Sequence, residues 1–310
     1  MAPENTLKAV RRALESGVGF EVDLQRLRSG EVIVLHDDTL RRTAAPRFGV
    51  WPQLARFLKR EHVVLDTKVD KLSLEEVRRV QVGDELHNEP VPLFTDILQE
   101  LARPPPLNGN RTSLQPSESY AHCFAELKSE AQSMGSGFDA KLIESAARAV
   151  RESAVAADRL TWISFSLGAL LEVKRRLRHH QALLIAHVRS ETEAWRVAKT
   201  AHAANLDGID LNADPKLVTR ELVDWMHARN RLVAVWVYRA RGSNEIKPVW
   251  EATSQDGVEA PVSNDIEPVW EAMSQHGVDY FTSNLPPEVH TWRLRSAKRS
   301  KKRSRKRRNS

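Results

Sequence analysis

The 310-residue sequence contains one cysteine, Cys123, and no long apolar run. A single cysteine excludes an intrachain disulfide and a zinc site built from several cysteines, and it favours an intracellular protein, cytoplasmic by default. No stretch approaches the ~18 to 20 consecutive apolar residues of a membrane-spanning helix, and the first residues lack the apolar core of a secretory signal. Hydrophobic residues still make up 41% of the chain, enough for one large domain or two small ones.

Basic residues are concentrated at one end of the chain. The sequence has 47 Lys and Arg against 41 Asp and Glu, a net charge of +6. Eleven of these basic residues lie between Arg293 and Arg308, so the rest of the chain has 36 basic residues against 41 acidic ones, a net charge of −5. This segment has no apolar face, and we expect a disordered tail at 291–310. Three interpretations of such a tail stay open. It is a nuclear address that also binds RNA, it attaches the protein to acidic lipid at a membrane surface, or it is a solvated tail with no partner.

Short apolar strands alternate with amphipathic helices along most of the chain. A helix is expected at 7–14 after a cap at Asn5 or Thr6, and the alternation of apolar and polar residues at 20–24 indicates a strand. The same criteria predict strands at 31–35, 121–127, 160–165, 182–188, 206–211, 232–238 and 278–282, and helices at 139–153, 167–178, 190–203 and 215–229. This order favours an α/β protein with a parallel sheet closed as a (β/α)8 TIM barrel. A doubly wound open sheet is the runner-up, although no glycine-rich nucleotide-binding motif follows a strand.

Two regions depart from this alternation. Residues 40–119 lack regular periodicity, and we expect an insertion after the second strand unit that ends in a mobile loop rich in proline and serine. A helix is duplicated across 243–278, because residues 243–258 recur twenty positions later. The barrel domain is therefore expected to span residues 1–290, and the tail 291–310.

Charged residues stand where the predicted strands end. In a parallel barrel, the side chains that carry chemistry project from the carboxyl ends of the strands. Glu21 and Asp23 are two apart on one strand, so both face the same side and offer oxygen ligands to a hard divalent cation. His36 follows the next strand, and Glu126 and Lys128 stand two apart at a third. A cation held by three carboxylates, beside a lysine and a histidine, would bind and polarise a phosphodiester.

The order of the motifs gives a more specific indication. The chain reads P-E-N-T at 3–6, E-V-D at 21–23 and G-E-V-I-V-L-H-D-D-T-L-x-R-T at 30–43. This succession closely resembles the glycerophosphodiester phosphodiesterase family, whose members are metal-dependent TIM barrels that hydrolyse glycerophosphodiesters to glycerol 3-phosphate and an alcohol. Similar matches follow downstream at 126–128, 163–166, 235–237 and 277–286.

The resemblance implies a cation site and an acid/base residue. It implies that one divalent cation, Mg²⁺ or Ca²⁺, is bound by the carboxylates of Glu21, Asp23 and Glu126. His36 would be one of two histidines that transfer protons during hydrolysis.

Two further residues would contact the substrate by the same resemblance. Lys128 would act in catalysis by binding the phosphate, and Trp236 would pack against the glycerol or the leaving group. Other roles stay open for both: a salt bridge of Lys128 to its strand neighbour, and a place for Trp236 among the core aromatics.

The sequence departs from the family pattern at its start and near its end. The family has a strand ending in H-R-G just upstream of the P-E-N-T segment, and this strand supplies the other histidine and a phosphate-binding arginine. Because Met1 lies two residues before Pro3, we expect either that the first barrel strand is absent and activity is weak, or that the polypeptide starts upstream. Asn284 stands where the family has an acid.

The leading hypothesis is a phosphoric diester hydrolase of glycerophospholipid metabolism that acts on a small glycerophosphodiester. One alternative is a lysophospholipase D-like relative, which would need an apolar rim for an acyl chain. Another is a catalytically impaired member that keeps the cation site and acts as a binding protein, docking through its tail.

Overall fold

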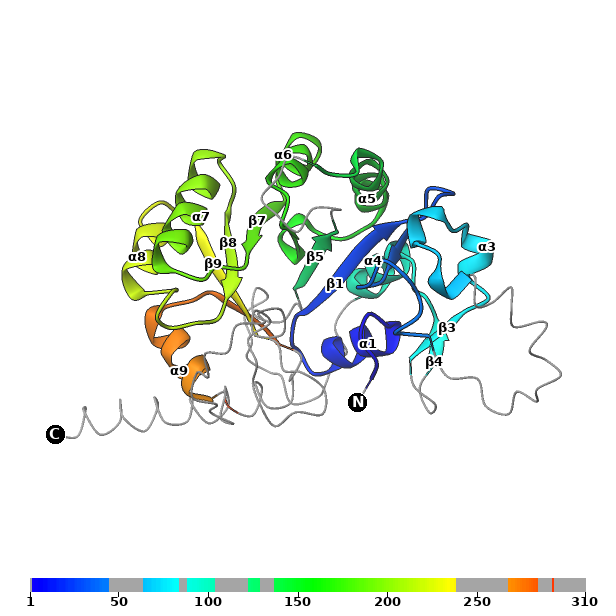
Figure 1. Cartoon of the computed structure of the whole chain (residues 1–310), viewed down its shortest axis with the longest axis horizontal. Coiled ribbons are helices and arrows are strands. Elements are labelled where there is room, and N and C mark those ends of the chain that lie inside the picture. The colour runs from blue at the N-terminus through cyan, green and yellow to red at the C-terminus, as the bar shows by residue number, and fades with distance from the viewer. Residues whose placement is uncertain are drawn as a thin grey trace. The chain divides into compact units, whose positions relative to one another are not determined.

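The computed structural model describes residues 2–44, 64–83, 88–103, 122–128, 137–237, 267–283 and 292. The chain divides into two compact units, a first unit of Met1–Leu184 and a second unit of Ile185–Ser310 (Figure 1). Within the described ranges, no helix is both long and apolar enough to cross a membrane. Four predicted features lie outside these ranges: the loop after residue 103, the first copy of the repeat, Asn284 and all of the basic tail but Trp292.

The first unit is built on a sheet of mainly parallel strands. Its strands, in spatial order, are β2 (Val32–Val34), β1 (Phe20–Arg26), β5 (Cys123–Leu127), β6 (Leu160–Ser164) and the beginning of β7 (Gln181–Ala186). From β1 to β7 each strand is parallel to its neighbour. Every residue of β6 is buried, as expected for a parallel strand covered on both faces.

The direction of β2 corrects the sequence prediction. The sequence analysis predicts a strand at 31–35 within a fold of parallel strands, but β2 runs antiparallel to β1, with Leu24 opposite Val34. The cause is the short connection between β1 and β2, because a parallel crossover needs a dozen or more residues. Gly30 adopts a φ of 103° in this turn, and the backbone N–H of Leu27 donates to the carbonyl of Glu31 at 2.9 Å. The segment after β2 therefore returns along β1 instead of leaving the sheet at its carboxyl end.

Several helices in the described part of the first unit accompany this sheet. They are α1 (Leu7–Glu15), α3 (Leu74–Val77), α4 (Phe94–Ala102), α5 (Ala140–Glu152) and α6 (Leu167–Arg176). The predicted cap of the first helix is confirmed, because Oγ1 of Thr6 accepts the backbone N–H of Ala9 at 3.2 Å. At Gly19, which precedes β1, a Cβ atom would lie 2.7 Å from the carbonyl oxygen of His122, so only glycine allows β1 to approach β5 there.

The sequence prediction missed helix α4, which packs against α1, α5 and β2. The same stretch of the chain holds an antiparallel pair, β3 (Gln81–Gly83) and β4 (Asn88–Pro90), and the 3-10 turn η2 (Val69–Lys71). Buried residues here, including Leu72 and Val77, share an apolar cluster with Ile33 of β2. The described parts of residues 40–119 are thus folded against the sheet, and the limits of the insertion stay a prediction.

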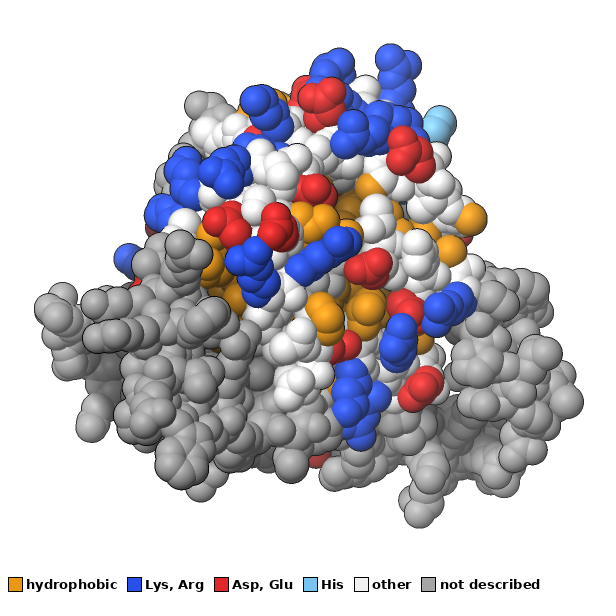
Figure 2. All heavy atoms as spheres, turned by 90° about the vertical axis from the view of Figure 1, so that its right-hand side faces the viewer, with side chains coloured by type: hydrophobic (Ala, Val, Ile, Leu, Met, Phe, Trp, Pro, Cys, Tyr) orange, Lys and Arg blue, Asp and Glu red, His pale blue; other side chains and the backbone are white. Residues whose placement is uncertain are grey.

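Figure 2 shows one face of the molecule on which acidic and basic side chains are interspersed. On the surface of the first unit, ion pairs join residues that are close in sequence, such as Arg79 and Glu75 at 2.5 Å and Lys71 and Asp70 at 2.8 Å. Such exposed pairs contribute little to stability but leave no large field of one sign.

The second unit repeats the strand–helix alternation. It contains α7 (Glu191–Ala203), β8 (Gly208–Asn212), α8 (Arg220–His227), β9 (Leu232–Val237), α9 (Glu267–His276) and β10 (Tyr280–Ser283). Strands β8, β9 and β10 are parallel in that order, and α7 and α8 pack on β8 and β9 (Figure 1). Helix α9 lies in the second copy of the repeat.

Candidate active site

Three carboxylates converge where β1 lies beside β5. Glu21 and Asp23 share one face of β1, and the parallel register places Asp23 directly opposite Glu126 of β5. One oxygen from each of the three lies within 4.8 Å of the other two. A cation bound at ~2.0 to 2.6 Å joins oxygens up to ~5 Å apart, so one ion can reach all three. The sequence prediction that these side chains meet agrees with this geometry, whereas ligation itself stays a prediction.

Lys128 lies between two of these carboxylates. Its Nζ is 2.8 Å from Oδ1 of Asp23 and 2.8 Å from Oε1 of Glu126. Burial alone would lower the pKa of Lys128, but the two carboxylates outweigh it and raise that pKa above its ordinary value. The ammonium is therefore charged, and the salt bridge to Glu126, left open as an alternative, is present.

Burial and the ammonium act in opposite directions on the two buried carboxyl groups. Burial would raise the pKa of Asp23, but the charge of Lys128 outweighs it, helped by His36, and the pKa is lowered. For Glu126 burial prevails and raises the pKa, with Lys128 offsetting part of the effect. The ammonium of Lys128 therefore favours the charged form of both carboxyl groups, most clearly that of Asp23.

Asn5 holds Asp23 from the other side. Its Nδ2 donates to Oδ2 of Asp23 at 2.7 Å, and its Oδ1 accepts the backbone N–H of Asp23 at 3.1 Å. Asn5 has a φ of 53°, in the left-handed region that Asn tolerates better than most residues. The P-E-N-T motif pointed to this position, but sequence reasoning gave Asn5 no role beyond a helix cap.

His36 lies near the carboxylates because β2 returns along β1. The backbone N–H of Leu35 donates to the carbonyl of Asp23 at 2.9 Å, which fixes the neighbouring residue beside the cluster. The His36 side chain is 56% exposed, and its Nδ1 lies 2.8 Å from Oδ1 of Asp37. Asp37 in turn binds Arg42, a contact that sequence reasoning did not foresee. His36 thus lies beside the carboxylates, just after an antiparallel strand, and its catalytic role stays a prediction.

Trp236 belongs to the second unit, on β9 opposite Asn212 of β8. Its ring centroid lies 6.1 Å from that of His187, at an interplanar angle of 40°. The indole Nε1 of Trp236 and Nε2 of His187 are both buried, and neither has a hydrogen-bond partner in the structure as described. These contacts leave both roles of Trp236 open.

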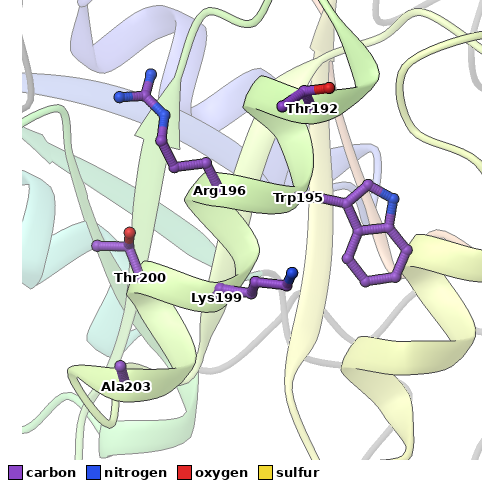
Figure 3. A pocket seen from close by; sticks show the side chains of 6 residues that line it. All are labelled: Thr192, Trp195, Arg196, Lys199, Thr200 and Ala203. Carbon is purple, nitrogen blue, oxygen red and sulfur yellow. The ribbon is translucent and has the colours of Figure 1, made fainter.

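A shallow hollow of about 440 Å³ lies along α7 (Figure 3). Its lining comes from one helix, with Arg196 and Thr200 on one side of the ribbon and Trp195 and Lys199 on the other. None of the predicted site residues takes part in this lining. The hollow lacks carboxylates and convergent elements, and we assign it no chemistry.

The fold and the site define an α/β protein of the TIM-barrel class with a carboxylate cluster between neighbouring parallel strands. Residues 1–260 match the glycerophosphoryl diester phosphodiesterase family, and the chain belongs to this family of phosphodiester-hydrolysing proteins. A glycerophosphodiester phosphodiesterase of Caldanaerobacter subterraneus subsp. tengcongensis is 26% identical over 221 residues, which cover 70% of this chain and 74% of that protein.

Solved structures support the same fold. A phosphodiesterase of Oleispira antarctica, determined in complex with the product sn-glycerol-3-phosphate, has a TM-score of 0.61 at 17% identity, covering 94% of this chain and 91% of that one. A glycerophosphodiester phosphodiesterase of Parabacteroides distasonis has a TM-score of 0.57 at 17% identity, covering 94% and 91%. The predicted TIM-barrel fold is confirmed, and the open doubly wound sheet is set aside.

Proposed function

We propose that this chain hydrolyses glycerophosphodiesters to glycerol 3-phosphate and an alcohol with the help of one divalent cation, within glycerophospholipid metabolism. The observation that carries the proposal is the convergence of Glu21, Asp23 and Glu126 within 4.8 Å beside a charged lysine. Membership of a phosphodiesterase family supports the reaction type.

The donor set suits a hard cation. All three side chains offer carboxylate oxygens, which favour Mg²⁺ or Ca²⁺, whereas zinc sites draw more often on histidine and cysteine. When bound, the cation would polarise a phosphoryl oxygen and neutralise part of the charge that develops there. Glu21, Asp23 and Glu126 would hold it, with Asn5 keeping Asp23 in orientation.

Three further residues would bind the substrate or transfer protons: Lys128, His36 and Trp236. The ammonium of Lys128 supplies positive charge to a phosphate oxygen, where charge grows in the transition state. His36 is exposed enough to reach a substrate, and its free nitrogen transfers a proton to the leaving alcohol or from water. Trp236 remains a candidate for contact with the glycerol or the leaving group. Its indole N–H can donate a hydrogen bond to a hydroxyl oxygen.

A turnover assay on glycerophosphocholine tests this proposal. We expect glycerol 3-phosphate to be released with Mg²⁺ or Ca²⁺ present, and release to stop with a chelator. Glu21→Gln should lower turnover by at least ~10²-fold through loss of a cation ligand, while Glu144→Gln on the exposed face of α5 should leave it unchanged. Turnover that resists the chelator would refute the dependence on a cation. Release of choline phosphate in place of glycerol 3-phosphate would show that a different ester bond is cleaved.

Lysophosphatidylcholine in the same assay addresses the alternative substrate class. A kcat/KM for the lysolipid above that for the soluble diester would favour the lysophospholipase D-like alternative. Binding of Mg²⁺ or Ca²⁺ without turnover of either substrate would favour the binding-protein alternative.

A further inference from the structure

We infer that Asp37 and Arg42 are positioning residues that hold His36 in a single tautomer, with Nδ1 protonated and Nε2 free for proton transfer. The inference rests on the proposed function for its catalytic consequence. Its structural content, the tautomer and orientation of one imidazole ring, is independent of any activity.

The side chains form one continuous chain of contacts. Nδ1 of His36 lies 2.8 Å from Oδ1 of Asp37. Arg42 binds both oxygens of Asp37, from Nε to Oδ2 at 2.6 Å and from Nη2 to Oδ1 at 2.9 Å. Nη2 of Arg42 also donates to Oε1 of Glu4 at 2.5 Å. The guanidinium of Arg42 is thus held by two carboxylates, and its planar geometry fixes the plane of the Asp37 carboxylate.

The charge of Asp37 decides the tautomer. Burial works against its ionisation, but hydrogen bonds from Arg42 and His36 outweigh burial and lower the pKa of Asp37 below its ordinary value. An ionised carboxylate only accepts hydrogen bonds, so the contact requires a proton on Nδ1 of His36. In the neutral ring the lone pair then lies on Nε2, the nitrogen that faces away from Asp37.

The backbone of the same segment is fixed from β1. Nε2 of Gln25 lies within hydrogen-bond distance of three successive carbonyl oxygens, those of Leu35, His36 and Asp37, at 2.8, 3.3 and 2.5 Å. The Cα position of His36 is therefore set by the sheet, and the rotation of its ring is left to Asp37. Arg42 makes no direct contact with the three carboxylates of the cluster in the described structure, and it reaches His36 through Asp37.

Exposure argues against a purely structural role for the Arg42 pair. The side chain of Arg42 is 49% exposed and that of Glu4 45%, and exposed ion pairs add little to stability. The neighbouring Arg41 is 51% exposed and pairs with Asp66, away from His36. Arg41 therefore provides a matched control: an arginine of similar exposure, one residue away, with its own carboxylate.

The first arm of the test measures kcat and KM on glycerophosphocholine with Mg²⁺ or Ca²⁺. We expect Asp37→Asn to lower kcat by ~10²- to 10⁴-fold and Arg42→Ala by ~10- to 100-fold, with KM changed less than about threefold. Arg42→Lys should recover part of the loss, since lysine keeps the charge but not the two-point contact. Arg41→Ala should match the unsubstituted chain. Equal kcat values for Arg42→Ala and Arg41→Ala would overturn the inference.

The second arm reads the tautomer directly by nuclear magnetic resonance of the chain with ¹⁵N-labelled histidine. The His36 signals are those that vanish in His36→Gln. We expect the neutral ring to be protonated on Nδ1 in the unsubstituted chain and in Arg41→Ala, and to shift toward Nε2 protonation in Asp37→Asn and Arg42→Ala. A neutral His36 protonated on Nε2 in the unsubstituted chain would refute the inference even if turnover is robust. If no variant hydrolyses the diester, the proposed function fails, and this arm still decides the positioning role.

Discussion

Two buried carboxylate sites of the first unit are balanced in opposite ways. Glu100 of α4 is 5% exposed, and two arginines bind it: Arg11 at 2.7 Å and Arg103 at 2.6 Å. In the candidate active site, the ammonium of Lys128 lies 2.8 Å from both Asp23 and Glu126, and Glu21 belongs to the same carboxylate cluster. Burying a charge is costly unless it is paired, so the Glu100 site is complete as it stands. The other site groups three carboxylates with one lysine, so it offers a cation three oxygen ligands, and cation binding there stays our proposal.

Of the substitutions at these carboxylate sites, removal of the Lys128 ammonium should have the largest effect on turnover and stability. We expect Lys128→Met to lower turnover by ~10²- to 10³-fold, through loss of the charge on the phosphate. Without added cation it should also lower the free energy of unfolding by ~3 to 5 kcal/mol, because the remaining carboxylates lose their partner. Denaturant unfolding with and without millimolar Mg²⁺ or Ca²⁺ measures this, and the cation should restore part of the loss. A variant as stable as the original chain, with no response to either cation, would mean that the carboxylates of the cluster do not need a positive charge beside them.

Glu100→Gln should have an intermediate effect confined to stability. The substitution leaves Arg11 and Arg103 without their shared carboxylate, and both are at least half exposed, so water can solvate them. We expect a loss of ~1 to 3 kcal/mol in the free energy of unfolding and turnover within about twofold of the original. A large loss of turnover at unchanged stability would show that the two sites are not separate in function.

Glu172 of α6 offers the same two-arginine arrangement at the surface and should show the smallest effect. Arg175 and Arg176 lie 2.7 and 2.6 Å from its carboxylate and lower its pKa to about 2. Because this pKa is below that of the unfolded chain, the stabilisation is complete above about pH 4.5 and is lost as the pH falls through 2. We expect Glu172→Gln to cost ~0.3 to 1 kcal/mol at pH 7. Urea unfolding at pH 7 and pH 3 checks this, and a cost that grows toward pH 3 would contradict the sign.

The convergence of the three carboxylates was predictable from the sequence because it depends on strand periodicity. Glu21 and Asp23 face one side of any strand that contains them, and the E-L-K motif places Glu126 on a parallel neighbour. The direction of β2 was not predicted, since apolar residues at 31–35 fit either a parallel or an antiparallel strand. Only the length of the turn decides between them.

The contacts that orient the site residues could not be predicted from periodicity. Asn5 reaches Asp23 across 18 residues, and Arg42 reaches Glu4 across 38. Such pairings depend on how a turn and a helix start are placed in space, although all four residues lie in the motifs that the sequence analysis singled out. Helix α4 was missed because its start carries no cap signal. It begins after Leu93, whose side chain cannot cap a helix, and Asp96 instead accepts the Leu93 N–H at 2.9 Å.

The tight turn between β1 and β2 also bears on the order in which the site assembles during synthesis. Asn5, Asp23 and His36 all lie within the first 36 residues, whereas Glu126 follows Asp23 by about 100 residues. Translation at ~5 to 20 residues per second delivers Glu126 at least ~5 s later, while a hairpin closes in ~1 to 10 μs. The part of the candidate site that holds Asn5, Asp23 and His36 is therefore a local structure of low contact order, open to formation at the ribosome. The cluster of three carboxylates exists only once β5 has joined β1.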